Sequence, residues 1–236
     1  MPSMISVVIP VFNRIDILKD TLDSIARQTY PEIEVIVVDD GSRPPVELQE
    51  FEASGSPFKK LIRQENQGAP AARNRGFDES RGEYVIFWDA DIIAEPDMLK
   101  KMSAALAVHP EAAYAYCDYY FGRHRMPAGP FAADRLRRQN YIAVTALIRR
   151  EAFPRYDQAI RRFQDWDLWL TMLEAGNTGV YVPGYLYRAV PHRSGISTWL
   201  PAMAYRAPWR WLPGWRGRVR EYERAREIII RKHGLA

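Results

Sequence analysis

The stretch VIFWDADI, residues 85–92, places two carboxylates directly after an apolar run. Its first four residues are consecutive and apolar, which is typical of a short strand that is buried on both faces. Asp89 and Asp91 therefore lie where this strand leaves the core, either as a polar strand end or as part of a site. If the extended geometry continues through Ala90, both carboxylates point the same way, because side chains alternate along a strand.

The segments around this stretch alternate between strand and helix patterns. Apolar runs at 4–10 and 34–40 flank a helix at 15–25, whose apolar residues recur every three or four positions. Asn13 is the expected N-cap of that helix, and Pro96 is expected in the first turn of a later helix. Further strands are expected at 58–63, 83–88, 112–117 and 141–148, and further helices at 70–80, 165–175 and 218–233. This order predicts an α/β fold with an open, mostly parallel sheet and helices on both faces.

The composition fits a water-soluble protein with one sizeable domain. The 236 residues are 47% hydrophobic and 26% charged, which suits one α/β domain or a domain with an appendage. No apolar stretch is long enough to cross a bilayer, and the first residues lack the basic start of a signal peptide, so we expect a cytoplasmic location. The single cysteine, Cys117, excludes an intramolecular disulfide framework and a cysteine-based zinc cluster.

Basic and aromatic residues concentrate in the C-terminal segment, residues 199–236. This segment interleaves tryptophans with arginines: Trp199, Trp209, Trp211 and Trp215 with Arg206, Arg210, Arg216, Arg218 and Arg220. Such uneven placement within a chain of net charge +4 points to a local surface rather than to a nucleic-acid binder. Three alternatives fit the pattern: contact with an anionic membrane, packing over the preceding domain, and contact with a second subunit.

Polar residues follow three of the expected strands. They are residues 10–13 (PVFN), 39–42 (DDGS) and 89–91 (DAD). Parallel strands bring these ends to one edge of the sheet, where four carboxylates repel one another unless a cation or hydrogen-bond donors are present. A divalent metal that carries a phosphorylated ligand meets this requirement, and oxygen ligands suit Mg²⁺ or Mn²⁺ better than zinc.

The usual phosphate-binding motifs are absent from the sequence. The first strand is followed by VFNR rather than by a glycine-rich turn, and no Walker-type Gly-Lys-Ser/Thr occurs. A dinucleotide-dependent dehydrogenase and a P-loop NTPase are therefore excluded as interpretations. Taken singly, residues 39–42 could be only a turn and Asp165 only a helix N-cap.

Five motifs together resemble the inverting glycosyltransferases of family 2. They are SVVIPVFNR, VIVVDDGS, ENQGAPAARNRG, FWDADI and FQDWDLWLTMLEAG, in this order, and the resemblance covers about residues 4–190. It implies a GT-A fold, in which a Rossmann-like, mostly parallel sheet is flanked by helices. The implied organisation is a catalytic domain at 1–198, with a nucleotide-sugar half at about 1–95 and an acceptor half at about 96–198. A helical and aromatic extension follows at 199–236.

The resemblance also implies which residues bind the nucleotide. Asp40 would contact the base and Asp39 would support the ribose side, while the backbone at Pro10 and the side chain of Asn13 line the same pocket. Four further residues would close the base and diphosphate region, with the arginine as a phosphate partner: Asn66, Gly68, Arg73 and Asn74.

The metal ligands and the catalytic base are implied in the same way. Asp91 is the expected metal ligand, Asp89 contacts the ribose or a metal-bound water, and His192 is a further candidate for the metal. Asp165 is the expected base, and Gln164 before it departs from the more usual glutamate of the family motif. Asp165 would remove the proton of the acceptor hydroxyl.

The function expected from these residues is sugar transfer from a nucleoside diphosphate sugar, UDP in particular, to a hydroxyl group. The acceptor would belong to polysaccharide, lipopolysaccharide or glycoconjugate synthesis and would be a glycan or lipid-linked, at the inner face of the membrane. Two alternatives remain open. A metal-dependent nucleotidyltransferase would release pyrophosphate from an NTP, and a non-catalytic scaffold would bind a nucleotide sugar without turnover.

Overall fold

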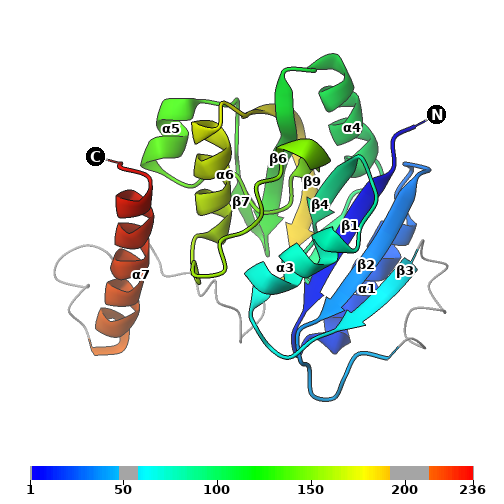
Figure 1. Cartoon of the computed structure of the whole chain (residues 1–236), viewed down its shortest axis with the longest axis horizontal. Coiled ribbons are helices and arrows are strands. Elements are labelled where there is room, and N and C mark those ends of the chain that lie inside the picture. The colour runs from blue at the N-terminus through cyan, green and yellow to red at the C-terminus, as the bar shows by residue number, and fades with distance from the viewer. Residues whose placement is uncertain (1, 48–57, 192–212, 236) are drawn as a thin grey trace.

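The computed structural model describes residues 2–47, 58–191 and 213–235 (Figure 1). It is an α/β fold with a curled sheet flanked by helices, which confirms the expected fold class. The strands are β1 (Ile5–Val11), β2 (Ile33–Asp39), β3 (Phe58–Arg63), β4 (Tyr84–Phe87), β5 (Ile92–Ala94), β6 (Ala112–Phe121), β7 (His124–Met126), β8 (Leu147–Arg149) and β9 (Thr178–Ala189). The helices are α1 (Ile15–Ala26), α3 (Ala69–Asp78), α4 (Met98–Val108), α5 (Ala133–Arg138), α6 (Gln164–Glu174) and α7 (Pro213–Lys232).

The sheet brings the polar strand ends to one edge. Its strand order is β3-β2-β1-β4-β8-β6-β9-β5, with β7 paired to β6. The first four strands are parallel, and β8 runs antiparallel to both β4 and β6. Because β6 therefore runs in the direction of β4, and β9 is parallel to β6, the carboxyl ends of β1, β2, β4, β6 and β9 share one edge.

Helices cover both faces of this sheet, as the alternating pattern predicts (Figure 1). Leu18 and Leu22 of α1 and Leu99 of α4 are buried in one cluster with Trp88. On the opposite face, Trp169 of α6 is buried in a second cluster with Phe87 and Ile148. Helix α3 lies close against β1: a Cβ built on Gly76 would come within 2.3 Å of Val8 Cγ1, so only glycine fits there. The four consecutive buried residues 85–88 (VIFW) contribute side chains to both of these clusters, one on each face of the sheet.

Two expected helix starts are wrong. The N-cap of α1 is Arg14, because Asn13 has a φ of +52° and its side chain serves another purpose. Asn13 Oδ1 accepts a hydrogen bond from the backbone N–H of Arg43 at 2.8 Å, and its own N–H donates to Ser42 Oγ at 3.0 Å. Asn13 therefore ties the loop after β1 to the loop after β2. Helix α4 begins at Met98, so Pro96 lies in the preceding turn rather than in the helix.

The second half of the sheet departs most from the expected pattern. The strand expected at 141–148 is reduced to β8, and the long strand β9 was not expected at all. Pro183 and Gly184 interrupt β9, with Gly184 at a φ of +119°, and its pairing with β6 shifts register at this position. A strand with a proline and a positive-φ glycine in its middle lacks the alternating pattern by which strands are predicted.

Helix α7 packs on the region around α6. Val219 and Ile229 are buried, and Tyr222 lies with its ring 5.0 Å from that of Phe163. The described part of the C-terminal segment therefore packs over the preceding domain, one of the three alternatives left open by the sequence. Trp199, Arg206, Trp209, Arg210 and Trp211 lie outside the described residues. Within the described part of the chain, no helix is long and apolar enough to span a membrane.

A charged cluster fastens the end of α7 to α6. The imidazole of His233 is 1% exposed; its Nε2 lies 2.8 Å from Asp167 Oδ1 and its Nδ1 2.7 Å from Glu174 Oε1. Lys232 contacts the same Asp167 at 2.8 Å and Asp157 at 2.7 Å. Burial of the imidazole opposes its charge, but the hydrogen bonds to the two carboxylates outweigh it and raise the pKa of His233.

Replacing His233 by Gln should remove a pH-dependent part of the stability. Because the folded pKa of His233 is raised, its contribution is fully present below the unfolded value of about 6.5 and is lost as the pH rises through the folded pKa. We expect the variant to be less stable than wild type by about 2 kcal/mol at pH 6, and the difference to shrink at higher pH. Urea unfolding at several pH values measures this. His109→Gln, which removes an exposed pair with Glu111, is the control; equal pH dependence in both variants would contradict the assignment.

Candidate active site at the carboxyl edge of the sheet

Three hydrogen bonds to backbone carbonyls hold the loop after β4 in place, two of them donated from other parts of the chain. Thr21 of α1 donates its hydroxyl to the carbonyl of Ala90 at 2.7 Å, and the indole N–H of Trp88 donates to the carbonyl of Ile92 at 3.1 Å. The N–H of Val190, just after β9, donates to the carbonyl of Asp91 at 2.8 Å. These contacts fix where Asp89 and Asp91 emerge from the core.

The two carboxylates of this loop are each paired with an arginine. Asp91 contacts Arg14, and Asp89 Oδ1 lies 2.7 Å from Arg73 Nη2. Burial and the nearby charge of Asp89 raise the pKa of Asp91, and the contact with Arg14 only partly offsets them. Asp91 is therefore a carboxylate whose ionised form would be stabilised by further positive charge.

Arg73 links the loop after β4 to the start of α6. One end of its guanidinium binds Asp89, and the other donates to Gln164 Oε1 at 2.8 Å. The guanidinium lies over the ring of Tyr156, 5.2 Å from its centroid, and the residue is only 6% exposed. Burial opposes the charge of Arg73, but Asp89 outweighs it and raises the pKa of the guanidinium. Arg73, the expected partner of the donor phosphate, therefore already has both terminal NH₂ groups of its guanidinium hydrogen-bonded to protein side chains.

Asp165 lies one residue into α6, with its carboxylate partly buried. Its Oδ1 accepts a hydrogen bond from the N–H of Trp166 at 2.9 Å, and its side chain is also hydrogen-bonded by Asn140. Burial raises the pKa of Asp165, against the effects of Asn140, Trp166 and the charge of Arg73. The N-cap of α6 is Phe163, in a left-handed conformation, so the interpretation of Asp165 as a mere N-cap does not describe this helix.

Asp39 and Asp40 are almost fully buried and hold two loops. Asp40, 2% exposed, accepts hydrogen bonds from Gln64 Nε2 and from the N–H groups of Gln67 and Gly68, at 2.8 to 2.9 Å. Asp39 accepts from the N–H groups of Ser42 and Val46. The two carboxylates therefore shape the loops around the expected nucleotide pocket, and the turn interpretation of residues 39–42 applies to Asp39.

The remaining nucleotide candidates fall into two groups. Pro10, Asn13, Asn66 and Gly68 lie at the carboxyl edge: Asn66 is exposed and packs against Gly41, and Gly68 is the N-cap of α3 with a φ of +92°. Asn74 has a different role. Its side-chain amide is buried and exchanges two hydrogen bonds of 2.8 Å with the backbone of Tyr156, so it fixes the residue that stacks on Arg73.

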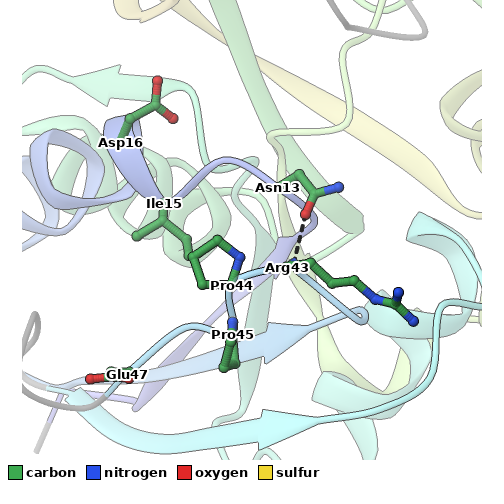
Figure 2. Close-up of a pocket in the computed structure, with 7 residues that line it drawn as sticks. All are labelled: Asn13, Ile15, Asp16, Arg43, Pro44, Pro45 and Glu47. Carbon is green, nitrogen blue, oxygen red and sulfur yellow. Dashed lines mark hydrogen bonds between the residues drawn. The ribbon is translucent and has the colours of Figure 1, made fainter.

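A shallow hollow of about 410 Å³ lies beside this edge, at the loops after β1 and β2 (Figure 2). Of the predicted site residues, only Asn13 lines it. Its walls also include Ile15, Asp16, Pro44 and Glu47. The hollow therefore adjoins the candidate site and does not contain its carboxylates.

The donor groups of the site fit a hard divalent cation. Asp89 and Asp91 offer carboxylate oxygens, the ligands that Mg²⁺ and Mn²⁺ prefer, and burial together with the nearby charge of Asp89 raises the pKa of Asp91. Within the described residues, no group of three or more histidine, cysteine or acidic side chains converges on one point. His192, the third candidate ligand, lies outside the described residues.

Three contributors to the site could not be identified from the sequence. Arg14 follows the first strand in VFNR but pairs with a residue 77 positions away. Asn140 and Tyr156 lie in stretches without a motif, and only the folded structure brings them to Asp165 and Arg73. No periodicity or spacing in the sequence marks such long-range partners.

Comparison with known proteins gives one family. The model of the family described as "Glycosyl transferase family 2" matches residues 6–156, more than half of the chain. The Escherichia coli protein named UDP-Glc:alpha-D-GlcNAc-diphosphoundecaprenol beta-1,3-glucosyltransferase WfgD is 23% identical over 190 residues, covering 78% of this chain and 75% of its own length. Curated relatives that match at 35–38% identity are longer, and the chain spans 39% or less of their length.

Solved structures share the fold. TarS of Staphylococcus aureus, in complex with UDP, superposes with a TM-score of 0.66 at 21% identity, covering 80% of this chain and 60% of that one. The mannosyltransferase PcManGT of Pyrobaculum calidifontis, in complex with GDP-Man and Mn²⁺, has a TM-score of 0.62 at 19% identity, covering 82% and 59%. The GT-A architecture expected from the motifs is thereby confirmed.

Proposed function

Since the chain belongs to glycosyltransferase family 2, we propose that it transfers a sugar from a nucleoside diphosphate, UDP in particular, to a hydroxyl group with inversion. The observation that carries this proposal is the arrangement around Arg73. One buried guanidinium joins the Asp89–Asp91 loop, which suits the donor diphosphate, to the start of α6, where Asp165 lies. A donor-side acid pair and a base on a separate element are what inverting transfer needs.

In the proposed reaction, Asp165 accepts the proton of the acceptor hydroxyl. The hydroxyl oxygen forms a bond to the anomeric carbon, and the bond from that carbon to the phosphate oxygen breaks, so that the nucleoside diphosphate leaves. Asn140 and the N–H of Trp166 hold the carboxylate in place, and its raised pKa makes it a stronger base than an exposed aspartate. Asp91, with Asp89, would hold a Mg²⁺ or Mn²⁺ ion, whose positive charge favours the departing diphosphate.

Donor binding is assigned to the carboxyl edge of the first half of the sheet. Pro10, Asn13, Asn66 and Gly68 surround the place for the nucleotide, and the loop that Asp40 holds leads into the N-terminus of α3, which favours negative charge. We assign about residues 1–95 to donor binding, 96–198 to acceptor binding and 199–236 to an extension. A glycan or lipid-linked acceptor, a peripheral membrane contact and a homodimer remain expectations.

A donor screen tests the proposal. UDP-, GDP- and dTDP-sugars, each with and without Mn²⁺, are titrated against wild type and Asp91→Ala, and the unfolding temperature is recorded. A ligand at 100 times its dissociation constant stabilises the protein by about 2.7 kcal/mol. We expect one nucleotide class to stabilise wild type in a Mn²⁺-dependent way, and Asp91→Ala to lose this effect.

Controls separate the alternative functions. Asp97→Ala, which removes an exposed pair with Lys101, should leave donor binding unchanged. Absence of donor binding to wild type, or binding indifferent to Asp91→Ala, would count against the site. Release of pyrophosphate from an NTP would favour a nucleotidyltransferase, and donor binding without transfer or hydrolysis would favour a scaffold.

A further inference from the structure

Two tyrosines and two arginines form a stack where the β6–β7 hairpin meets β9. The rings of Tyr120 and Tyr185 lie 4.6 Å apart at 31°, Arg188 lies 4.5 Å over Tyr120, and Arg125 lies 5.7 Å over Tyr185. Because 4.6 Å leaves no room for a guanidinium between the rings, the arginines cover the outer faces. We call these four residues the Arg–Tyr stack. It holds two guanidinium groups in place through cation–π contacts.

The Arg–Tyr stack adjoins the candidate active site. Tyr120 and Arg188 are register partners at the ends of β6 and β9, on the same sheet edge as the end of β4. Two residues beyond Arg188, the N–H of Val190 donates to the carbonyl of Asp91. Tyr119 precedes Tyr120 in β6, and burial together with the charge of Asp165 raises its pKa to about 12.

The positive charge of the Arg–Tyr stack is not neutralised within the described part of the chain. Arg125 and Arg188 are exposed, as is the neighbouring Arg123, and none of the three forms an ion pair with a described carboxylate. Arg188 donates to the carbonyl of Gly122, a neutral group. By contrast, Arg14 and the buried Arg73 are both paired with aspartates. Stacked guanidinium groups keep N–H donors at their edges, and their fixed geometry suits two-point binding of an oxyanion.

We propose that the Arg–Tyr stack is an acceptor subsite that binds an oxyanion, phosphate or carboxylate, carried by the glycan acceptor. The inference rests on the proposed function and extends it to the chemical class of the acceptor. The covered ring faces leave little aromatic surface for a neutral sugar to stack on, whereas two fixed cations attract an anionic chain. An acceptor glycan whose reacting hydroxyl lies at Asp165 would extend to this hairpin and place its charged group there.

Binding of defined oligomers tests the proposal. The probes are a glycerol phosphate hexamer, a galacturonate hexamer and, as the neutral match, maltohexaose, titrated by calorimetry at two salt concentrations. We expect wild type to bind at least one anionic hexamer, more weakly at higher salt, and to bind maltohexaose much less. Arg125→Gln and Arg188→Gln should each weaken binding about tenfold. Arg137→Gln, which removes an exposed arginine of α5 paired with Asp134, should have no effect.

The outcomes separate this inference from the proposed function. Equal binding of maltohexaose, or unchanged binding in the double variant of Arg125 and Arg188, would overturn the acceptor subsite. So would arginine-dependent binding to phosphatidylglycerol vesicles with no binding of either hexamer, which would make the stack a lipid contact. Donor stabilisation is measured in the same variants and should persist, because the stack is outside the donor site. If wild type binds the hexamers but no nucleotide sugar, the proposed function fails alone.

Discussion

Asp165→Asn should lower the rate of sugar transfer by a factor of about 10² to 10⁴ while donor binding is retained. The amide cannot accept the proton of the acceptor hydroxyl, whereas the Asp89–Asp91 loop is untouched. Transfer is measured by release of nucleoside diphosphate at saturating donor, and donor binding by thermal stabilisation. In wild type, the rate should fall as the pH drops through the raised pKa of Asp165, because the protonated carboxyl is no longer a base.

The same substitution should leave the protein at least as stable as wild type. Because burial raises the folded pKa of Asp165, its ionisation costs stability as the pH rises above the unfolded value, and a neutral amide in its place is spared this cost. The hydrogen bond from Trp166 can be kept by the amide oxygen. Asn140 Oδ1 is buried and has no hydrogen-bond partner among the described residues, so it is able to accept a hydrogen bond from the new NH₂ group after a flip of either amide. Near-normal transfer by Asp165→Asn would exclude Asp165 as the base, and a large loss of stability would make it a structural residue.

Arg73→Met should abolish transfer and also destabilise the fold. Removing one member of a buried ion pair costs about 3 to 5 kcal/mol of stability. Because the carboxylate of Asp89 is 35% exposed, its hydration offsets part of this cost. We therefore expect a loss of about 2 to 3 kcal/mol in the free energy of unfolding. Urea unfolding and transfer assays on the same preparation measure the two effects.

Two further variants interpret the Arg73 result. Arg75→Met removes an exposed pair with Glu79 on the same helix and should cost less than about 0.5 kcal/mol. Arg73→Lys keeps the positive charge but loses the two terminal NH₂ groups of the guanidinium, so it cannot hydrogen-bond to Asp89 and Gln164 at the same time. We expect this variant to be more stable than Arg73→Met and still impaired in transfer. Full activity of Arg73→Lys would show that only the charge matters and that the link to α6 does not.

The first half of the fold was predictable because its signals are local. Helix α1 carries an apolar stripe at helical spacing, and β1, β2 and β4 are short apolar runs, so the alternation of strands and helices is visible in single segments. The same holds for α6, which ends before Gly176 at a φ of +82° as its sequence indicates. The strand β9 was missed for the opposite reason: Pro183 and Gly184 interrupt the alternating pattern of its sequence, and pairing with β6 and β5 keeps the segment extended.

By itself, the sequence determined the family, the α/β class and the three groups of polar residues at strand ends, because parallel strands necessarily bring their carboxyl ends together. The tertiary structure alone decided how those residues are paired. The pair Arg14–Asp91 joins positions 77 residues apart, and the pair Arg73–Gln164 joins positions 91 residues apart. The side chains of Asn74 and Asn13 form hydrogen bonds to backbone groups rather than facing open space. Such pairs depend on how the connecting helices cross the sheet, so no local pattern encodes them.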